Sequence, residues 1–450
     1  MSIFAQILNK FRQDAFSERD KGYRFERLMK AYLKTTTLYA NLFEEVWLWT
    51  EFPFHDQFGG KDTGIDLVAR TIEGEYWAIQ CKCYAANVFI SKPDVDTFLS
   101  TSGKRFETES GMTGFVQRLW ISTTNKWNST AEQTIRNQNP PVTRLNLIDL
   151  ENDDVDWNSL EQGTFGVASR SKPFAIREHQ QQAIDQTHAY FKIDEATGQP
   201  AHTRGKLIMA CGTGKTLMSL RLAEDYLKGS GLVLFCAPSI SLVGQSMREW
   251  LSQSRAKLSP LVVCSDSKAS RQEDAIPMTL ASFEYPATTD PKRLMEHYAA
   301  SRRRNPDGLV VVFSTYQSID VIHQAQEMGL PEFDLIVCDE AHRTTGSALP
   351  GVSKKDASAF MKVHYDENVQ AKKRLYMTAT PRIYGETAKR KGAEDDFTIA
   401  SMDDESLYGP VAYQIKFGEA VEKKLLTDYK VVVLAVEEDA LRGRMPETDD

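Results

Sequence analysis

The sequence predicts an α/β fold made of a mixed first unit, a second unit with a parallel sheet, and the beginning of a third. Its 450 residues fit about three units at roughly 150 residues per domain. After residue 173, β-rich runs alternate with helical patterns, which is typical of βαβ units and a parallel sheet. An acidic break at Glu151–Asp154 precedes this alternation. The expected strands of the second unit are 205–210, 232–237, 261–264, 309–314, 334–339 and 374–379.

The first unit has helical and strand-like segments in mixed order. Residues 1–35 are expected to be helical, because Phe25, Leu28, Met29 and Tyr32 recur at helical spacing. We expect strands at 65–69 and 76–81 around the turn at 73–75, a helix at 92–107 after Ser91, a strand at 118–123, a helix at 129–137 and a strand at 144–150.

Composition predicts a folded cytoplasmic protein. No run approaches the roughly 20 apolar residues of a membrane helix, and the first 16 residues lack the features of a signal peptide. The six cysteines are expected to be buried, reduced thiols: Cys81, Cys83, Cys211, Cys236, Cys264 and Cys338. The net charge of −8 argues against nonspecific coating of nucleic acid but permits a local basic groove. Four basic clusters either line such a groove or are solvated faces: 302–304, 354–355, 372–374 and 389–391.

The segment Met209–Thr216 has the features of a phosphate-binding loop. It follows a strand and opens a helix, so Gly212, Thr213 and Gly214 can turn their backbone N–H groups toward phosphate oxygens. Lys215 is expected to reach the β- and γ-phosphates, and Thr216 to bind Mg²⁺. The strict pattern has glycine where this chain has Met209. The alternative is a chance glycine turn before a helix.

A second motif places two carboxylates directly after a buried strand, in Leu335–His342. We expect Asp339 to hold the Mg²⁺ and Glu340 to orient and activate the attacking water, as phosphoryl transfer requires. The alternative is an acidic helix start after a strand.

The first unit contains a less specific set of candidate catalytic residues. Adjacent strands are expected to bring Asp66 close to Gln80 and Lys82, which share one strand face because they are two residues apart. Asp66 and Gln80 offer oxygen ligands to Mg²⁺, and Lys82 can stabilise developing charge during phosphodiester hydrolysis. The alternative makes Asp66 a solvated turn residue and Lys82 an edge-strand charge that prevents aggregation.

Residues 170–435 resemble the DEAH-type superfamily 2 helicases, on the two motifs above and on several more. The resemblance implies that Gln180 recognises adenine, that His342 belongs to the nucleotide site, and that Thr378 and Thr380 couple ATP hydrolysis to movement. It also implies that 236–245 and 313–317 contact nucleic-acid phosphates, which positions a strand without reading its sequence.

Residues 15–160 resemble the Mrr-type branch of the PD-(D/E)xK nucleases, in which Gln often replaces Glu, as Gln80 does here. By this resemblance Glu26 supports the metal, and the turn 59–64 presents Asp66. The expected domains are therefore a nuclease at 1–165, a RecA-like ATP-binding lobe at 166–417, and the start of a second motor lobe at 418–450.

The order of domains resembles the N-terminal half of type ISP restriction–modification enzymes. That resemblance implies ATP and Mg²⁺ as cofactors, double-stranded DNA as substrate, and continuation into a second motor lobe, a methyltransferase and a target-recognition region. Without the second lobe we expect weak ATP binding and poor hydrolysis. Two alternatives stay open: a defence or repair helicase whose first domain grips DNA without cutting, and an inactive truncated product.

Overall fold

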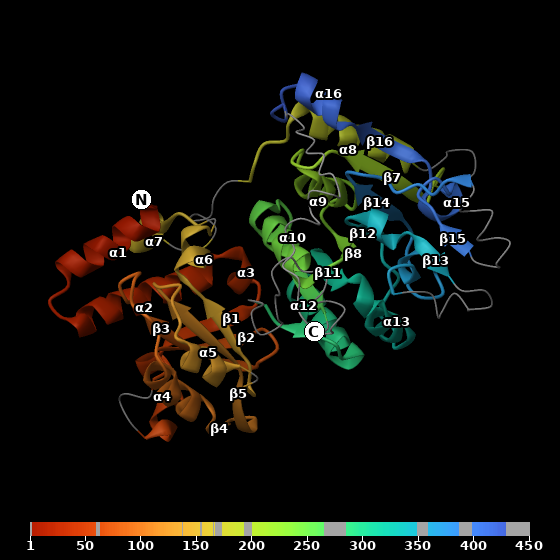
Figure 1. The fold of residues 1–450 in the computed structure, drawn as a ribbon. Helices are drawn as coiled ribbons and strands as arrows, with labels where there is room; N and C mark the ends of the chain where they lie inside the picture. The colour runs from red at the N-terminus through yellow and green to blue at the C-terminus, as the bar shows by residue number, and fades with distance from the viewer. Residues whose placement is uncertain are drawn as a thin grey trace, which may run out of the picture.

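The computed structural model describes residues 2–59, 64–136, 138–153, 155–164, 166, 173–192, 200–264, 285–348, 359–386 and 398–428. Figure 1 shows two α/β bodies, the first ending near residue 166 and the second beginning at residue 173. The predicted fold class is confirmed. No helix in these ranges has the length and apolar character needed to cross a membrane.

The first body is built on a six-stranded sheet of order β1-β2-β3-β5-β4, with β6 beside β5. Its strands are β1 (Phe43–Leu48), β2 (Leu67–Thr71), β3 (Tyr76–Lys82), β4 (Arg105–Thr108), β5 (Gly111–Ser122) and β6 (Val142–Leu145). β2 runs antiparallel to β3, whereas β3 and β5 are parallel. The start of β2 and the ends of β3 and β5 therefore meet at one edge of the sheet. We call it the nuclease edge, after the domain that the sequence predicts there.

Helices cover both faces of this sheet, so alternate residues of β3 face different cores. Trp77, Ile79 and Cys81 belong to the core shared with α1 (Ile3–Asp14) and α2 (Glu18–Thr35). Tyr76 and Ala78 belong to the opposite core, with α4 (Lys92–Ser102) and α5 (Ser129–Ile135).

Two local predictions for this body were wrong in extent. The helix expected at 92–107 ends at Ser102, and 105–108 form β4, an outer strand that pairs with β5. The strand expected at 144–150 divides into β6 and α6 (Leu147–Glu151), because Asp149 accepts the N–H of Asn146 at 2.7 Å and caps the helix. Residues 1–35 are helical as predicted, in two helices, and the second begins after the N-cap Ser17.

The second body has an eight-stranded sheet of order β10-β9-β11-β8-β12-β14-β7-β16. Its strands are β7 (Arg204–Met209), β8 (Gly231–Ala237), β9 (Leu258–Val263), β10 (Ala287–Thr288), β11 (Leu309–Thr315), β12 (Leu335–Cys338), β14 (Arg374–Thr378) and β16 (Val411–Ile415). Every described neighbour pair is parallel. All six predicted strands are confirmed, whereas β10 and β16 were missed. Of the unit expected at 418–450, the structure describes residues 418–428.

Two layers of helices enclose this parallel sheet, as Figure 1 shows. One face carries α8 (Glu178–Tyr190), α9 (Lys215–Tyr226) and α10 (Ile240–Gln253), and the other α12 (Pro291–Arg304) and α13 (Ile319–Glu327). Residues such as Phe235 and Trp250 are fully buried in the first core, and Val312 and Ile322 in the second. Both faces are covered, which is why the strands are continuous apolar runs.

Polar contacts join the two bodies. Arg304 at the end of α12 donates to the carbonyl oxygens of Ala40 and Asn41 at 3.0 and 3.1 Å, which lie at the end of α3 (Thr37–Ala40). Arg293 forms an ion pair with Glu75 at 2.7 Å. These contacts hold the first body against the helices of the second.

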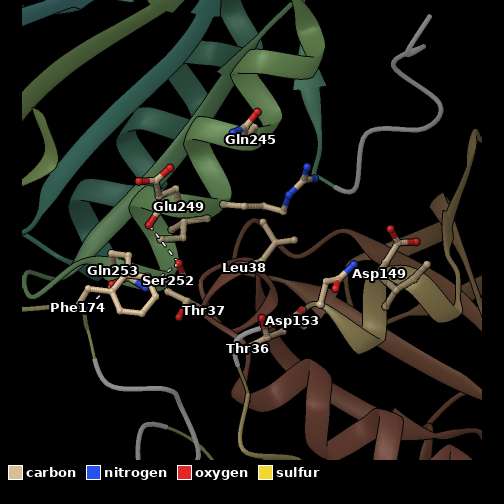
Figure 2. Close-up of a pocket in the computed structure, with 14 residues that line it drawn as sticks. Thr36, Thr37, Leu38, Asp149, Asp153, Phe174, Gln245, Glu249, Ser252 and Gln253 are labelled. Atoms are coloured by element: carbon tan, nitrogen blue, oxygen red, sulfur yellow. Dashed lines mark hydrogen bonds between the residues drawn. The ribbon is translucent and has the colours of Figure 1, made fainter. Parts of the chain in front are cut away.

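A cavity of about 620 Å³ lies between the bodies. Figure 2 shows Asp149 and Asp153 facing it from the first body, and Gln245 and Glu249 of α10 from the second. Burial raises the pKa values of Asp149 and Glu249. The lining carries no residue of the predicted active sites.

Candidate active sites

The nuclease edge brings Asp66 and Gln80 into direct contact. Asp66 precedes β2, in which Leu67 pairs with Ile79 of β3, so its side chain reaches the end of that neighbouring strand. Gln80 donates its amide N–H to Asp66 Oδ2, and the backbone N–H of Cys81 donates to the same oxygen at 2.7 Å. The predicted juxtaposition of Asp66 with the end of β3 is therefore present.

A glycine is needed just before Asp66. Gly64 has a φ of +68°, a conformation that residues with a Cβ rarely adopt. A Cβ built there would lie 2.9 Å from the backbone nitrogen of Phe98 in α4. The close approach of α4 thus fixes how the chain enters β2. Residues 60–63 of the expected turn at 59–64 lie outside the described ranges.

Glu26 of α2 belongs to the same electrostatic cluster. Burial, and then the Asp66 carboxylate, raise the pKa of Glu26 to about 7, and the Lys82 ammonium opposes this rise. The fold thereby brings a helix residue next to Asp66 and Lys82, which are far away in sequence. A carboxyl with a raised pKa beside another carboxylate is typical of a site that receives a cation.

The side chains at this edge fit a hard divalent cation such as Mg²⁺. Gln80 is almost fully buried, and its amide oxygen has no hydrogen-bond partner. A buried carbonyl oxygen without a partner is costly unless a ligand uses it. Among the described residues, no three His, Cys, Asp or Glu side chains are grouped to hold a metal. A cation here would therefore combine Gln80 and Asp66 with water, as Mg²⁺ commonly does.

The loop Ala210–Gly214 connects β7 to α9 in the manner expected of a phosphate-binding loop. Gly212 and Gly214 have φ angles of +81° and +82°. Thr213 donates its hydroxyl to the carbonyl of Ala210 at 2.7 Å, and Lys215 donates to that of Met209 at 3.3 Å. Lys215 and Thr216 form the first turn of α9, where a helix attracts negative charge.

One thiol in this loop differs from the prediction. Cys211 is exposed, whereas the other five cysteines are buried as expected. The difference follows from position, because Cys211 lies after β7 has ended and the loop turns outward to present its backbone.

Gln180 and its neighbour support this loop from α8. Gln180 accepts the N–H of Arg177 at 2.9 Å and donates to the carbonyl of Thr213 at 3.3 Å. His179 lies 2.9 Å from the same carbonyl oxygen through Nε2. A Cβ at Gly214 would lie only 2.3 Å from the Gln180 amide nitrogen. His179 was missed by the sequence analysis, since no local pattern shows its contact with a loop 34 residues away. Recognition of adenine by Gln180 stays a prediction.

Asp339 and Glu340 follow β12 at the same end of the sheet. Asp339 is buried, and burial together with the Glu340 charge raises its pKa to about 6. The Glu340 N–H donates to Asp339 at 3.0 Å, and Glu340 has a φ of +47°, which is uncommon for a residue with a side chain. Tyr316 donates to the Asp339 carbonyl at 2.8 Å, a positioning contact that the sequence did not reveal.

His342 connects this motif to the end of β14. Its Nδ1 lies 3.0 Å from the Thr378 hydroxyl and 3.3 Å from a Glu340 carboxylate oxygen. Thr378 in turn accepts the N–H of Thr380 at 3.2 Å. A continuous polar chain therefore runs from Glu340 to Thr380. Coupling of ATP hydrolysis to movement by Thr378 and Thr380 stays a prediction.

Sheet order explains why these segments meet. β12, β14 and β7 are consecutive neighbours and parallel, so their carboxyl ends lie side by side. Ligands of open parallel sheets bind at this end of the strands.

Most cations of the basic clusters at 302–304 and 372–374 make contacts within the fold. Arg302 donates to the carbonyl of Gly231, Arg304 to the first body, and Arg374 to the carbonyls of Val363 and Val369. Lys373 is buried over aromatic rings, and Lys372 pairs with Asp334. These cations stabilise the fold. The clusters at 354–355 and 389–391 lie outside the described residues.

Comparison with protein families agrees with this geometry. Residues 34–166 match the model of an Mrr-type restriction endonuclease, and residues 173–383 match that of the res subunit of type III restriction enzymes. The probable helicase A859L of African swine fever virus is 28% identical over 233 residues, which are 52% of this chain and 22% of that protein.

Solved structures include two similar type ISP enzymes. The ATP-dependent restriction–modification enzyme LlaBIII, bound to DNA, is 36% identical with a TM-score of 0.72, over 97% of this chain and 26% of that one. A nuclease-deletion mutant of LlaGI, in complex with a DNA substrate mimic, is 38% identical with a TM-score of 0.42, over 56% of this chain and 21% of that one. The chain spans about a quarter of the length of LlaBIII. It spans slightly less of the length of LlaGI and of the viral helicase.

Proposed function

Because this chain joins an Mrr-type restriction endonuclease domain to a helicase domain of restriction enzymes, as type ISP restriction–modification enzymes do, we propose that it cuts and moves along double-stranded DNA. An ATP-driven motor and a Mg²⁺-dependent endonuclease would act together on foreign DNA in the cytoplasm. One observation carries the proposal: the nuclease edge gathers Asp66, Gln80 and Lys82, with Glu26 beside them.

Each side chain at the nuclease edge has a distinct part in this proposal. Asp66 and Gln80 supply oxygen ligands, and Glu26 adds a second carboxylate. Mg²⁺ held by these residues would supply positive charge that polarises the scissile phosphate and favours ionisation of water. Lys82 stabilises the negative charge that develops on the phosphate and orients the attacking water.

In the motor, the loop 210–214 and Lys215 hold the phosphates of ATP. Thr216 and Asp339 would hold the Mg²⁺ that accompanies ATP. Glu340 would orient the water that attacks the γ-phosphate of ATP. The contacts from His342 to Thr378 pass the change at the γ-phosphate to the end of β14. We propose domain limits of 1–165, 166–417 and 418–450 for the nuclease, the first motor lobe and the start of the second.

Plasmid cleavage by the whole chain tests the proposal. We expect Mg²⁺- or Mn²⁺-dependent nicking or cutting by the parent, and a roughly 10²- to 10³-fold slower rate for Lys82→Ala, because a charge-stabilising donor is lost. Lys34→Ala is the matched control, since this half-exposed lysine lies on α2 and contacts Glu45 at 3.8 Å. If the folded parent does not cut, the first domain grips DNA without cleaving it or the chain is inactive.

Cleavage is expected to depend on pH through Glu26. Its pKa of about 7 means that it is protonated below pH 7 and ionised above it. A ligand must be ionised to bind a cation, so the Mg²⁺ concentration for half-maximal cleavage should rise up to about tenfold per pH unit below 7. Titrating Mg²⁺ from pH 6 to 8 measures this slope, and Glu26→Gln should flatten it. Equal slopes for parent and Glu26→Gln would exclude Glu26 as the titrating group.

A further inference from the structure

The loop Tyr84–Ile90 begins two residues after Lys82, and hydrogen bonds hold it in a defined conformation. We propose that Phe89 of this loop and Lys126 of the neighbouring loop form a DNA contact beside the scissile phosphate, with Phe89 against the sugars and base edges of the minor groove and Lys126 on a phosphate. The inference rests on the proposed function, because it names how the nuclease edge holds its DNA.

Strand direction places both loops at the nuclease edge. β3 and β5 are parallel, and Lys82 is the register partner of Ser122. The chain therefore leaves both strands at the edge that holds Asp66 and Gln80. DNA whose phosphate reaches these groups must pass next to the two loops.

Hydrogen bonds hold the two loops to each other. The hydroxyl of the fully buried Thr124 donates to the carbonyls of Ala86 and Val88 at 3.2 and 2.7 Å. The N–H of Ile90 donates to the carbonyl of Lys126 at 2.8 Å. The loop 84–90 thus has a defined conformation before any ligand binds, which lowers the entropic cost of binding.

The side chains at the tip of this loop point into solvent. Phe89 is 57% exposed and Val88 39%, although both are large and apolar. The Lys126 ammonium lies 5.3 Å from the centre of the Phe89 ring. An exposed aromatic ring beside a cation is costly to leave in water, and it matches the alternating apolar and anionic surface of a DNA groove.

The local charge also favours a polyanion. The whole chain has a net charge of −8, yet residues 83–93 and 119–131 contain no Asp or Glu. Lys126 and the exposed side chains of Asn87 and Asn125 therefore face solvent without a carboxylate in either loop. The nearest carboxyl group to the first loop in the sequence, Asp94, accepts hydrogen bonds from Tyr84 and Ser91. An exposed lysine between two loops that lack carboxylates of their own favours a polyanion such as DNA at this place.

Site-specific photocross-linking tests the contact directly on the whole chain. The probe is a fluorescent DNA duplex in Ca²⁺, with p-benzoylphenylalanine in place of Phe89 or, as control, of Met112, which is also 57% exposed but lies on the β4–β5 hairpin. We expect a DNA cross-link from position 89 at least about tenfold stronger than from position 112. No DNA cross-link at 89, or one to a second protein copy, would overturn the inference.

Binding of the same duplex gives a second measure. Phe89→Ala should weaken binding about tenfold, as loss of an aromatic contact with nucleotides does. Lys126→Ala should reduce the slope of log affinity against log salt by about one, whereas Phe89→Ala should leave that slope unchanged. A role limited to loop folding would not separate the two variants, so equal slopes would count against the contact.

Cleavage assays distinguish this inference from the proposed function. Plasmid cutting by the parent without a DNA cross-link at position 89 would overturn the contact and leave the nuclease intact. A DNA cross-link at position 89 without plasmid cutting would support the contact and contradict the proposed cleavage activity. The absence of both the cross-link and the cutting would overturn the contact and the proposed cleavage.

Discussion

Asp66→Asn is expected to lower the rate of plasmid cleavage by about 10³-fold or more, since it removes the carboxylate on which the nuclease edge is built. Asp66 Oδ2 accepts hydrogen bonds from the Gln80 amide and from the N–H of Cys81. Asparagine has nearly the same shape and can keep these two contacts through its oxygen. It has no charge for a cation, so metal affinity and cleavage should fall while the fold is preserved.

The matched control for this substitution is Asp96→Asn. Asp96 lies on α4 of the same domain, where it pairs with Lys92 at 2.6 Å and is about half-exposed. Calorimetric titration with Mn²⁺ should show weaker binding for Asp66→Asn and unchanged binding for Asp96→Asn. Cleavage by Asp66→Asn at the rate of Asp96→Asn would eliminate the nuclease edge as the reacting site.

The motor strands and their motifs could be predicted because each signal is local. β7, the glycine loop and α9 are contiguous, and the strands of a sheet covered on both faces are short apolar runs. The nuclease edge was partly predictable for the same reason, since a short turn joins β2 to β3. Glu26 came only from resemblance to a nuclease family, as it lies on a helix 40 residues before Asp66 in the sequence.

Contacts between distant segments could not be predicted. Thr213 gives no sign of the contact from His179, and nothing near Asp339 points to Tyr316. The role of the charge clusters could not be predicted for a related reason. Whether an arginine lines a groove or donates to a carbonyl depends on tertiary packing, and Arg374 is buried among carbonyl oxygens.

Short helices and strands at chain reversals were also predicted wrongly. Residues 147–150 are apolar enough for a strand, but the capping contact from Asp149 to Asn146 turns them into a helix. Residues 105–108 become β4 because β5 extends back to Gly111 and offers a hairpin partner. Pairing and capping decided both cases, and neither is visible as periodicity.

Lys215→Ala is expected to weaken ATP binding by roughly 10- to 100-fold, the range for loss of a hydrogen bond to a charged group. In the structure, its ammonium donates to the Met209 carbonyl at 3.3 Å, so it already lies across the loop that would hold the phosphates. Lys215 also lowers the pKa of Asp339, against the effect of burial. Its removal should therefore favour protonated Asp339 and weaken binding of the accompanying Mg²⁺ as well.

Binding of a fluorescent ATP analogue measures this effect without requiring turnover. Glu340→Gln is the informative comparison, because Glu340 is proposed to orient water rather than to hold nucleotide. The affinity of Glu340→Gln for the ATP analogue should therefore stay close to that of the parent. Parent-like affinity of a folded Lys215→Ala would remove the loop 210–214 as the nucleotide site. Loss of affinity in Lys215→Ala alone would separate nucleotide binding, which rests on α9 and its loop, from activation of water at the end of β12.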